Sequence, residues 1–293
     1  MADFHTWVLA IRPKTLPAAA GPVLVGTALA YSDQRLAILP ALGALCIAVL
    51  LQIGVNLAND YFDHIRGIDT QDRLGPKRVT QSGLIAPDRV KSAMWGVMGM
   101  ALVLGSVLVI RGGWPVVFIG VACILGALGY SGGPYPLASH GLGDLFVFIF
   151  FGLVAVCGTY YIQTLQLSWR VIAMAVMVGL PITAIIVVNN LRDMYTDQKA
   201  GKYTLAVLLG ERGSKLEYTL LLLSAFGLSL IFWRIGWFSP WILLTWLGLP
   251  LCWVLIRLVW NSPISPALNA VLAKTAAFSL CYNVLLTIGI ALG

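Results

Sequence analysis

Charged residues are scarce in this sequence. Asp, Glu, Lys and Arg make up 11% of its 293 residues, whereas apolar residues make up 59%. A soluble domain is usually about one quarter charged, so this composition excludes an ordinary soluble globular protein. The mean hydropathy of +0.87 agrees with that conclusion. We therefore expect lipid, rather than water, to be the main solvent of the folded chain.

The sequence also lacks the motifs of several common sites. Neither G-x-x-x-x-G-K-[ST] nor G-x-G-x-x-G occurs, so a nucleotide-binding fold is not supported. The three histidines lie far apart and make no zinc-like pattern. The five cysteines are scattered singly through apolar segments, which predicts small core hydrophobes rather than disulfides.

Apolar residues instead gather in blocks of roughly 17 to 25 residues, the length that crosses a hydrocarbon core as a helix. Such blocks exclude a transmembrane barrel and predict an all-α membrane protein with nine transmembrane helices. The predicted spans are about 15–31, 38–58, 91–110, 114–130, 142–163, 169–191, 216–233, 238–259 and 268–291. No cleavable signal peptide is expected before the first span.

The basic residues give these spans an expected orientation. With a cytoplasmic N-terminus, 15 of the 19 Lys and Arg residues, Arg73 among them, fall in inside segments. The remaining four are Arg35, Arg111, Arg170 and Arg234. This is a strong positive-inside bias. The net charge of +7 therefore reflects topology and predicts contact with membrane lipid, not with nucleic acid.

The acidic residues share this sidedness, although the positive-inside rule does not require it. Eleven of the 12 fall inside, mostly in two long polar connections at about 59–90 and 192–215. A third inside connection, 129–144, is rich in Gly and Pro but has no Lys or Arg. We therefore expect any chemistry to take place on the cytoplasmic side.

Two similar segments stand where inside connections begin: N-L-A-N-D-Y-F-D at 56–63 and N-N-L-R-D-M-Y-T-D at 189–197. Their polar residues recur at helical spacing, so each set lies on one helix face. The first stripe is Asn56, Asn59, Asp60 and Asp63, and the second stripe is Asn190, Asp193 and Asp197. The match predicts one transmembrane domain, 1–293, with four-helix halves at about 1–140 and 141–260 around a central cavity, plus a ninth helix.

Two carboxylates on each of two opposed helices would present hard oxygen donors across that cavity. Mg²⁺ suits such a site, because it accepts carboxylates while keeping positions for water and phosphate oxygens. A carboxylate at the centre of a spanning helix costs about 2.5 to 3.5 kcal/mol, and a counter-cation would offset this cost. A simpler alternative is that both stripes only cap their helices at the water boundary. The matching of two stripes favours a metal bound by Asp60, Asp63, Asp193 and Asp197.

Diphosphate is the expected ligand of such a cluster when basic residues take its remaining oxygens. The candidates are Lys77, Arg78, Lys199 and Lys202, although positive-inside charge also explains each of them. A hydrophobic cavity beneath a diphosphate indicates an isoprenoid chain. Metal binding would stabilise the departing diphosphate and lower the barrier to an allylic carbocation. The ring of Tyr130 could shield that cation; an interfacial belt residue is the alternative for Tyr130.

These residues resemble the UbiA superfamily of intramembrane aromatic prenyltransferases. Its motifs of the type N-D-x-x-D after helix 2 and D-x-x-x-D after helix 6 match 59–63 and 193–197. The resemblance covers nearly the whole chain. It is closest to the branch that prenylates 1,4-dihydroxy-2-naphthoate, on R-P-K-T-L-P-A-A at 12–19, N-D-Y-F-D-H-I-R-G-I-D at 59–69 and G-G-P-Y-P-L-A at 132–138.

Departures from the 4-hydroxybenzoate branch favour the same choice. Gly67 stands where that branch usually has a further Asp, and Leu137 follows Tyr135-Pro136 where it tends to have a basic pair. The resemblance implies an Mg²⁺-dependent enzyme that joins a polyprenyl diphosphate to the naphthoate ring. Carboxylate, diphosphate and a proton are lost, and the product is demethylmenaquinone.

Asp144 and His140 are candidates for the base, against the alternative that each is only a loop residue. Asn56, Asn59 and Asn190 are expected to assist at the donor site. The resemblance implies a bacterial inner (plasma) membrane enzyme. Rival functions are prenyl transfer to 4-hydroxybenzoate or another aromatic, and secondary transport, for which carboxylates are expected near mid-span.

Overall fold

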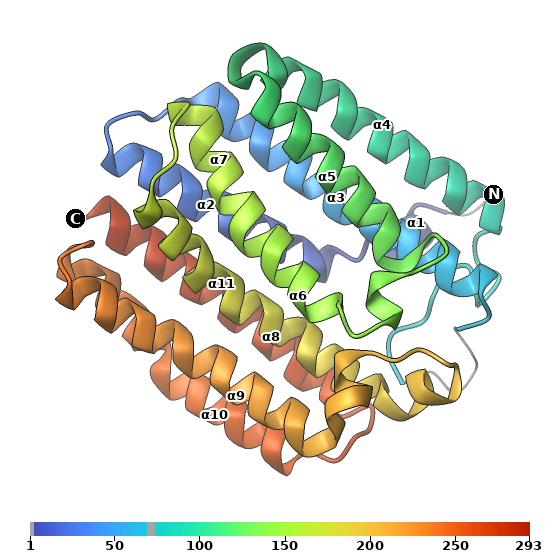
Figure 1. Ribbon diagram of the computed structural model, residues 1–293. Helices are drawn as coiled ribbons and strands as arrows, with labels where there is room; N and C mark the ends of the chain where they lie inside the picture. The colour runs from blue at the N-terminus through green and yellow to red at the C-terminus, as the bar shows by residue number, and fades with distance from the viewer. Residues whose placement is uncertain (1–2, 69–73) are drawn as a thin grey trace.

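The computed structural model describes residues 3–68 and 74–293 (Figure 1). Within those ranges the chain is built of helices and short connections, and its sole pairing of strand type is an isolated bridge between His140 and Tyr203. Asp69 and Arg73, which took part in the sequence predictions, lie outside the described residues. The predicted all-α class is confirmed for the described part of the chain.

The apolar helices begin and end close to the predicted spans. They are α2 (Leu16–Ser32), α3 (Ile38–Ile65), α4 (Pro87–Gly112), α5 (Trp114–Ser131), α6 (Gly143–Val147) with α7 (Ala155–Thr164), α8 (Trp169–Lys199), α9 (Leu205–Arg234), α10 (Leu249–Asn261) and α11 (Leu268–Ala291). A π-helix, Phe148–Val154, joins α6 to α7, and a 3₁₀ segment, Pro240–Gly248, leads into α10.

Eight continuous helical segments in the described residues are long and apolar enough to cross a membrane. They are all of the apolar segments above except α2, which has 17 residues. The chain is therefore a multi-pass membrane protein, and the exact count of nine spans stays a prediction. Helix α2 lies where the first span is predicted.

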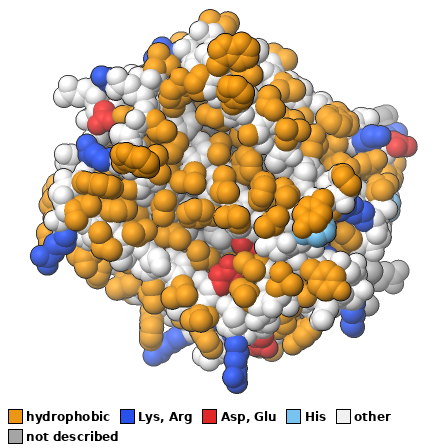
Figure 2. All heavy atoms as spheres, in the orientation of Figure 1, with side chains coloured by type: hydrophobic (Ala, Val, Ile, Leu, Met, Phe, Trp, Pro, Cys, Tyr) orange, Lys and Arg blue, Asp and Glu red, His pale blue; other side chains and the backbone are white. Residues whose placement is uncertain are grey.

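Helix α8 is the most enclosed of these segments. In its most apolar stretch 67% of the residues are buried, whereas the corresponding value for α3 and for α5 is 11%. A helix that is apolar on all sides belongs in the core, and α8 packs against α9, α11 and α7. The other helices direct large side chains outward, as the apolar surface in Figure 2 shows. Ile110 and Leu39 are more than 80% exposed, which suits contact with lipid.

Two helices continue beyond their predicted ends. Helix α3 runs to Ile65 and α8 runs to Lys199, so both stripes lie within helices, as their spacing predicted. Helix α9 begins at Leu205, well before the predicted span, and bends at Gly210, whose φ of 70° is not helical. Hydrogen bonds and ion pairs with neighbouring segments allow the polar last turns of α3 and α8 to remain helical.

A short helix that was not predicted, α1 (Phe4–Ile11), lies at the N-terminus. Asp3 caps it by accepting a hydrogen bond from the Thr6 backbone N–H at 2.9 Å. Hydrogen bonds from the Thr6 hydroxyl and backbone lower the pKa of the Asp3 carboxyl below its ordinary value.

Three connections meet at one end of the bundle (Figure 1). They follow α3, α5 and α8. The backbone N–H of Tyr203 donates to the Ser139 carbonyl at 3.1 Å. The amide of Asn269, near the start of α11, donates to the Leu74 carbonyl at 3.0 Å. These contacts bring segments distant in sequence together around the ends of α3 and α8.

Candidate active site

Asp60 of the first stripe is buried beneath the segment that follows α3. Its side chain is 1% exposed and accepts hydrogen bonds from the backbone N–H groups of Val79, at 3.2 Å, and Thr80, at 3.0 Å. The Nη2 atom of Arg12 lies 3.7 Å from its Oδ2 atom. Asp60 is thus held by the backbone and by a guanidinium from the N-terminal segment.

Asp63 lies one turn further along α3 and is 5% exposed. The Nη2 atom of Arg78 donates to its Oδ2 atom at 3.1 Å. Arg78 is itself 5% exposed, so the ion pair is buried. A buried carboxylate without such a partner would be costly. Arg78, one of the residues predicted to bind diphosphate, therefore forms an ion pair with a carboxylate of the first stripe.

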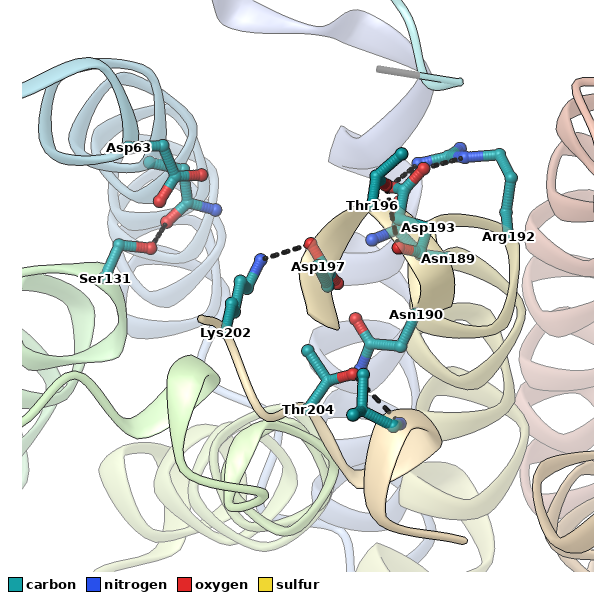
Figure 3. Close-up of polar contacts among 12 residues, drawn as sticks. Asp63, Ser131, Asn189, Asn190, Arg192, Asp193, Thr196, Asp197, Lys202 and Thr204 are labelled. Carbon is teal, nitrogen blue, oxygen red and sulfur yellow. Dashed lines mark hydrogen bonds and ion pairs between the residues drawn. The ribbon is translucent and has the colours of Figure 1, made fainter. Parts of the chain in front are cut away.

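The two asparagines of the first stripe have protein partners. The Asn56 amide nitrogen donates to the Ile11 carbonyl at 2.8 Å and to the Thr15 hydroxyl at 2.9 Å. Asn59 accepts a hydrogen bond from the hydroxyl of Ser131 (Figure 3). Asn56 therefore anchors the N-terminal segment to α3. Its predicted contact with the donor stays a prediction, as does that of Asn59.

The second stripe is buried near the end of α8. Asp193 and Asp197 are 5% and 7% exposed. Arg192 donates from Nε to Asp193 Oδ1 at 2.9 Å and from Nη2 to the other oxygen (Figure 3). The Nζ atom of Lys202 lies 3.7 Å from Asp197 Oδ1. Arg192 is 1% exposed and is held further by the side-chain oxygens of Asn189 and Asn269.

The two stripes face a shared region. Figure 3 shows Asp63 on one side, Asp197 on the other, and the side chain of Lys202 between them. The Tyr130 hydroxyl of α5 interacts electrostatically with both of these carboxylates and with Asp144. The helix ends that were predicted to oppose one another thus have Tyr130 as a common neighbour.

Each of the four aspartates has a basic partner: Arg12 with Asp60, Arg78 with Asp63, Arg192 with Asp193 and Lys202 with Asp197. Sequence reasoning named Arg78 and Lys202 but missed Arg12 and Arg192. Arg12 belongs to the R-P-K-T segment, and Arg192 directly precedes Asp193, so both signals were present. Lys77 and Lys199 are exposed and form no ion pair within the described residues.

The donor set suits magnesium, with one restriction. Within residues 3–68 and 74–293, no three Asp, Glu, His or Cys side chains are close enough to hold one metal ion together. Mg²⁺ does not need such a cage, because it is usually bound by one or two carboxylates together with water and substrate phosphates. A carboxylate pair on each of two helices, flanked by Arg and Lys, fits a diphosphate accompanied by Mg²⁺. Ligation by the four aspartates stays a prediction.

A fifth buried aspartate adjoins this region. Asp144, at the start of α6, is 3% exposed and accepts a hydrogen bond from the Asn190 amide at 3.3 Å. The carboxyl of Glu217 on α9 interacts with it electrostatically. Sequence reasoning passed over Glu217, although an acid within an apolar span is a recognisable functional signal. Glu217 lines an apolar groove of about 390 Å³ beside α9, together with Leu180, Leu216 and Ser224.

His140, the other candidate base, has a different environment. It is exposed, and its ring stacks on Tyr135 with 3.6 Å between the ring centroids. Its Nδ1 atom lies 2.8 Å from the Pro136 carbonyl oxygen. The contacts of His140 are made within the connection between α5 and α6, whereas Asp144 is buried beside the second stripe.

Apolar helices that enclose paired carboxylates and basic side chains at one end define an integral membrane protein with a buried polar site. Residues 19–282 match the model of the UbiA prenyltransferase family. The chain belongs to that family.

Relatives agree with this placement over most of the chain. A 1,4-dihydroxy-2-naphthoate octaprenyltransferase of Mycobacterium tuberculosis is 44% identical over 218 residues, which are 74% of each chain. An enzyme of the same description from Escherichia coli is 36% identical over 98% of this chain and 96% of its own length. A UbiA homolog from Archaeoglobus fulgidus bound to GPP and Mg²⁺ has a TM-score of 0.59 at 14% identity, covering 98% of this chain and 100% of that one.

Proposed function

We propose that this protein transfers a polyprenyl group from a polyprenyl diphosphate to 1,4-dihydroxy-2-naphthoate, with loss of the carboxylate as CO₂, and so forms demethylmenaquinol, the reduced form of demethylmenaquinone. The observation that carries the proposal is the pair of buried aspartate stripes that face a shared region beside Arg78 and Lys202. The acceptor is proposed from the relatives of M. tuberculosis and E. coli, whose names specify it.

The four aspartates are proposed to hold Mg²⁺ and, through it, the donor diphosphate. When bound, Mg²⁺ would supply charge stabilisation of the departing diphosphate. Arg12, Arg78 and Lys202, which pair with three of these carboxylates, are proposed to contact the phosphate oxygens of the bound donor. Arg192 is held by two asparagines besides Asp193, so we assign it to orienting that carboxylate. The A. fulgidus homolog bound to GPP and Mg²⁺ supports this ligand class.

Tyr130 is proposed to face the reacting end of the prenyl chain. Its hydroxyl interacts electrostatically with Asp63 and Asp197, which come from different stripes, and this supports a position for the phenol ring beside the region between them. The ring face would stabilise a developing allylic cation by a cation–π interaction. Its role is electrostatic and orienting, because no bond to Tyr130 is formed in this reaction.

We further propose that the site opens to the cytoplasm of a bacterium and that α2 forms the ninth span. The N-terminal Arg12 and the connections bearing Lys77, Arg78 and Lys202 all lie near the aspartate end of the bundle. The positive-inside rule assigns that end to the cytoplasm. The division into two four-helix halves is part of the same proposal. Labelling of a cysteine introduced at exposed Ser82, in sealed inverted vesicles but not in intact cells, would test the orientation.

The acceptor is the part of the proposal most open to direct test. Purified protein would receive Mg²⁺, one labelled polyprenyl diphosphate and a mixture of 1,4-dihydroxy-2-naphthoate, 4-hydroxybenzoate and homogentisate. We expect prenylated naphthoquinol together with CO₂, and no product when EDTA is present. Preferential labelling of 4-hydroxybenzoate or homogentisate would overturn the acceptor. Failure to form any prenylated product or to release diphosphate would favour a transporter over an enzyme.

A further inference from the structure

Among the residues that the structure describes, Asp144 differs from the other buried aspartates in having no cationic partner. Asp60, Asp63, Asp193 and Asp197 each lie within 4 Å of an Arg or Lys nitrogen. Among the described residues, no Lys, Arg or His nitrogen forms an ion pair with Asp144, which is as deeply buried at 3% exposure. A carboxylate held by a cation is a weak proton acceptor, whereas one without a cation keeps its basicity.

The groups around Asp144 come from three other helices. Asn190 of α8 donates to its Oδ2 atom, and Tyr130 of α5 and Glu217 of α9 interact with it electrostatically. Glu217 also lines the apolar groove. These neighbours are an amide, a phenol and a second acid. None of them neutralises a charge on Asp144, and Tyr130 links Asp144 to the region between the two stripes.

A hydrogen bond from Asn190 connects Asp144 to the second stripe. Asn190 belongs to the second stripe, yet its amide nitrogen donates to Asp144 and not to Asp193 or Asp197. A hydrogen bond from Asn190 fixes the direction of one carboxylate oxygen. Asn190 therefore orients the Asp144 carboxylate in this structure. The second stripe thus contains the pair Asp193 and Asp197 and also an amide that binds a third carboxylate, that of Asp144.

We propose that Asp144 is the catalytic base that takes the proton from a ring hydroxyl of the aromatic acceptor, and that Asn190 positions it for this task. The inference rests on the proposed function, because it requires a phenolic acceptor next to the prenyl diphosphate. It assigns the acceptor ring to a position next to Tyr130 and Asp144, on the α6 side of the aspartate stripes.

The chemical step balances without a further reactant. The hydroxyl proton moves to a carboxylate oxygen of Asp144, and the electron pair of that O–H bond is released into the ring. The ring carbon forms a bond to C1 of the prenyl group while the C1–O bond breaks, and its electron pair leaves with the diphosphate. When the ring then loses CO₂, the pair of the broken C–C bond returns through the ring to the oxygen, which takes the proton back from Asp144.

The test compares donor binding with transfer in Asp144→Asn. This variant keeps the shape of the side chain and removes its basicity. We expect prenyl transfer to 1,4-dihydroxy-2-naphthoate to fall by about 100-fold or more, the usual contribution of general base catalysis. Binding of labelled polyprenyl diphosphate with Mg²⁺ should stay near the wild-type value, because Asp144 is assigned to the acceptor and not to the donor. Asp88→Asn, at an exposed position near the start of α4, is the matched control and should leave both quantities unchanged.

A more acidic acceptor separates a base from a structural residue. A halogenated naphthoate whose hydroxyl is already ionised needs no base, so the ratio of Asp144→Asn to wild-type activity should rise with it. If Asp144→Asn cannot be purified, Asp144→Ala assayed with added formate gives the same information, because formate should restore part of the transfer.

Three results would overturn the assignment. They are retention of more than half of wild-type transfer in Asp144→Asn, loss of donor binding together with transfer, and an activity ratio that does not respond to acceptor acidity or to formate. Wild-type protein that fails to prenylate 1,4-dihydroxy-2-naphthoate would instead refute the proposed function, since that measurement does not involve Asp144.

Discussion

The Nε atom of Arg192 donates to Oδ1 of Asp193 at 2.9 Å, and its Nη2 atom donates to the other oxygen of the same carboxylate. The two residues are adjacent in sequence, and both are almost fully buried. The planar guanidinium therefore determines the plane of the Asp193 carboxylate.

Replacing Arg192 by Lys should keep the charge and lose this geometry, because an ammonium cannot make two parallel hydrogen bonds. We expect transfer to fall about tenfold or more and the Mg²⁺ concentration for half-maximal activity to rise, as when a group that orients a metal ligand is lost. Titration of Mn²⁺ binding by electron paramagnetic resonance would measure the change without turnover. Arg212→Lys, at an exposed position on α9, is the control, and an equal shift there would contradict the role of Arg192.

Removing the charge of Asp60 or Asp193 should abolish turnover while the protein stays folded. In Asp60→Asn the amide oxygen can still accept from the Val79 or Thr80 backbone N–H. A metal-stabilised leaving group contributes several kcal/mol, so a loss of at least about 100-fold is expected. Diphosphate release and thermal unfolding would be measured together. Undiminished release in a folded Asp60→Asn or Asp193→Asn variant would refute the metal assignment.

Two lysines after the second stripe should behave differently. Lys202 lies 3.7 Å from Asp197 and between the stripes, whereas Lys199 is exposed. A charge-assisted contact with diphosphate contributes about 1.5 to 3 kcal/mol. Lys202→Ala should therefore raise the KM for the donor roughly tenfold or more, and Lys199→Ala should leave it near the wild-type value. Steady-state kinetics at saturating acceptor would measure the KM for the donor. Equal effects of the two substitutions on this KM would show that Lys202 does not contact the donor.

Asn269 connects the start of α11 to both the site and the segment that covers it. Its side-chain oxygen accepts from Arg192 Nη1 at 2.8 Å, and its amide donates to the Leu74 carbonyl at 3.0 Å. Asn269→Ala leaves both partners unsatisfied, at about 1 to 3 kcal/mol for each buried group. We expect faster amide hydrogen exchange at Val79 and Thr80, whose N–H groups bind Asp60. Unchanged exchange at these amides would show that the covering segment is held independently of α11.

The sequence predicted the features that follow from composition and helical spacing. Apolar block lengths located the helices to within a few residues at most ends, and the i, i+3, i+7 spacing placed Asp193 and Asp197 on one face of α8. The ends of α3 and α8 were harder to locate, because their polar turns read as solvent-exposed connections. They remain helical because distant segments, such as the backbone at Val79, supply partners that hydropathy does not register.

The partners of the aspartates could not be assigned from one sequence. Arg12 approaches Asp60 across 48 positions of the chain, a tertiary contact that local spacing does not encode. Asn190 fits the spacing of the second stripe, yet it hydrogen-bonds Asp144 because α6 packs against α8 at that level. Periodicity identifies the face on which a side chain lies, and packing decides which of its neighbours it contacts.

That packing depends on a close approach between the π-helix and α8. A Cβ atom added to Gly152 would lie 2.8 Å from the Gly179 Cα and 2.9 Å from the Ala175 carbonyl oxygen, both backbone atoms. Gly152→Ala should therefore separate the two segments and destabilise the protein by about 1 to 3 kcal/mol, as overpacking does. The π-helix continues α6, which carries Asp144, and α8 carries Asn190. Transfer should therefore fall more than donor binding. Gly120→Ala on α5, where an added Cβ meets no atom within 4 Å, is the matched control for thermal unfolding in detergent and for transfer. A Gly152→Ala protein as stable and as active as Gly120→Ala would show that this approach does not set the distance between Asp144 and Asn190.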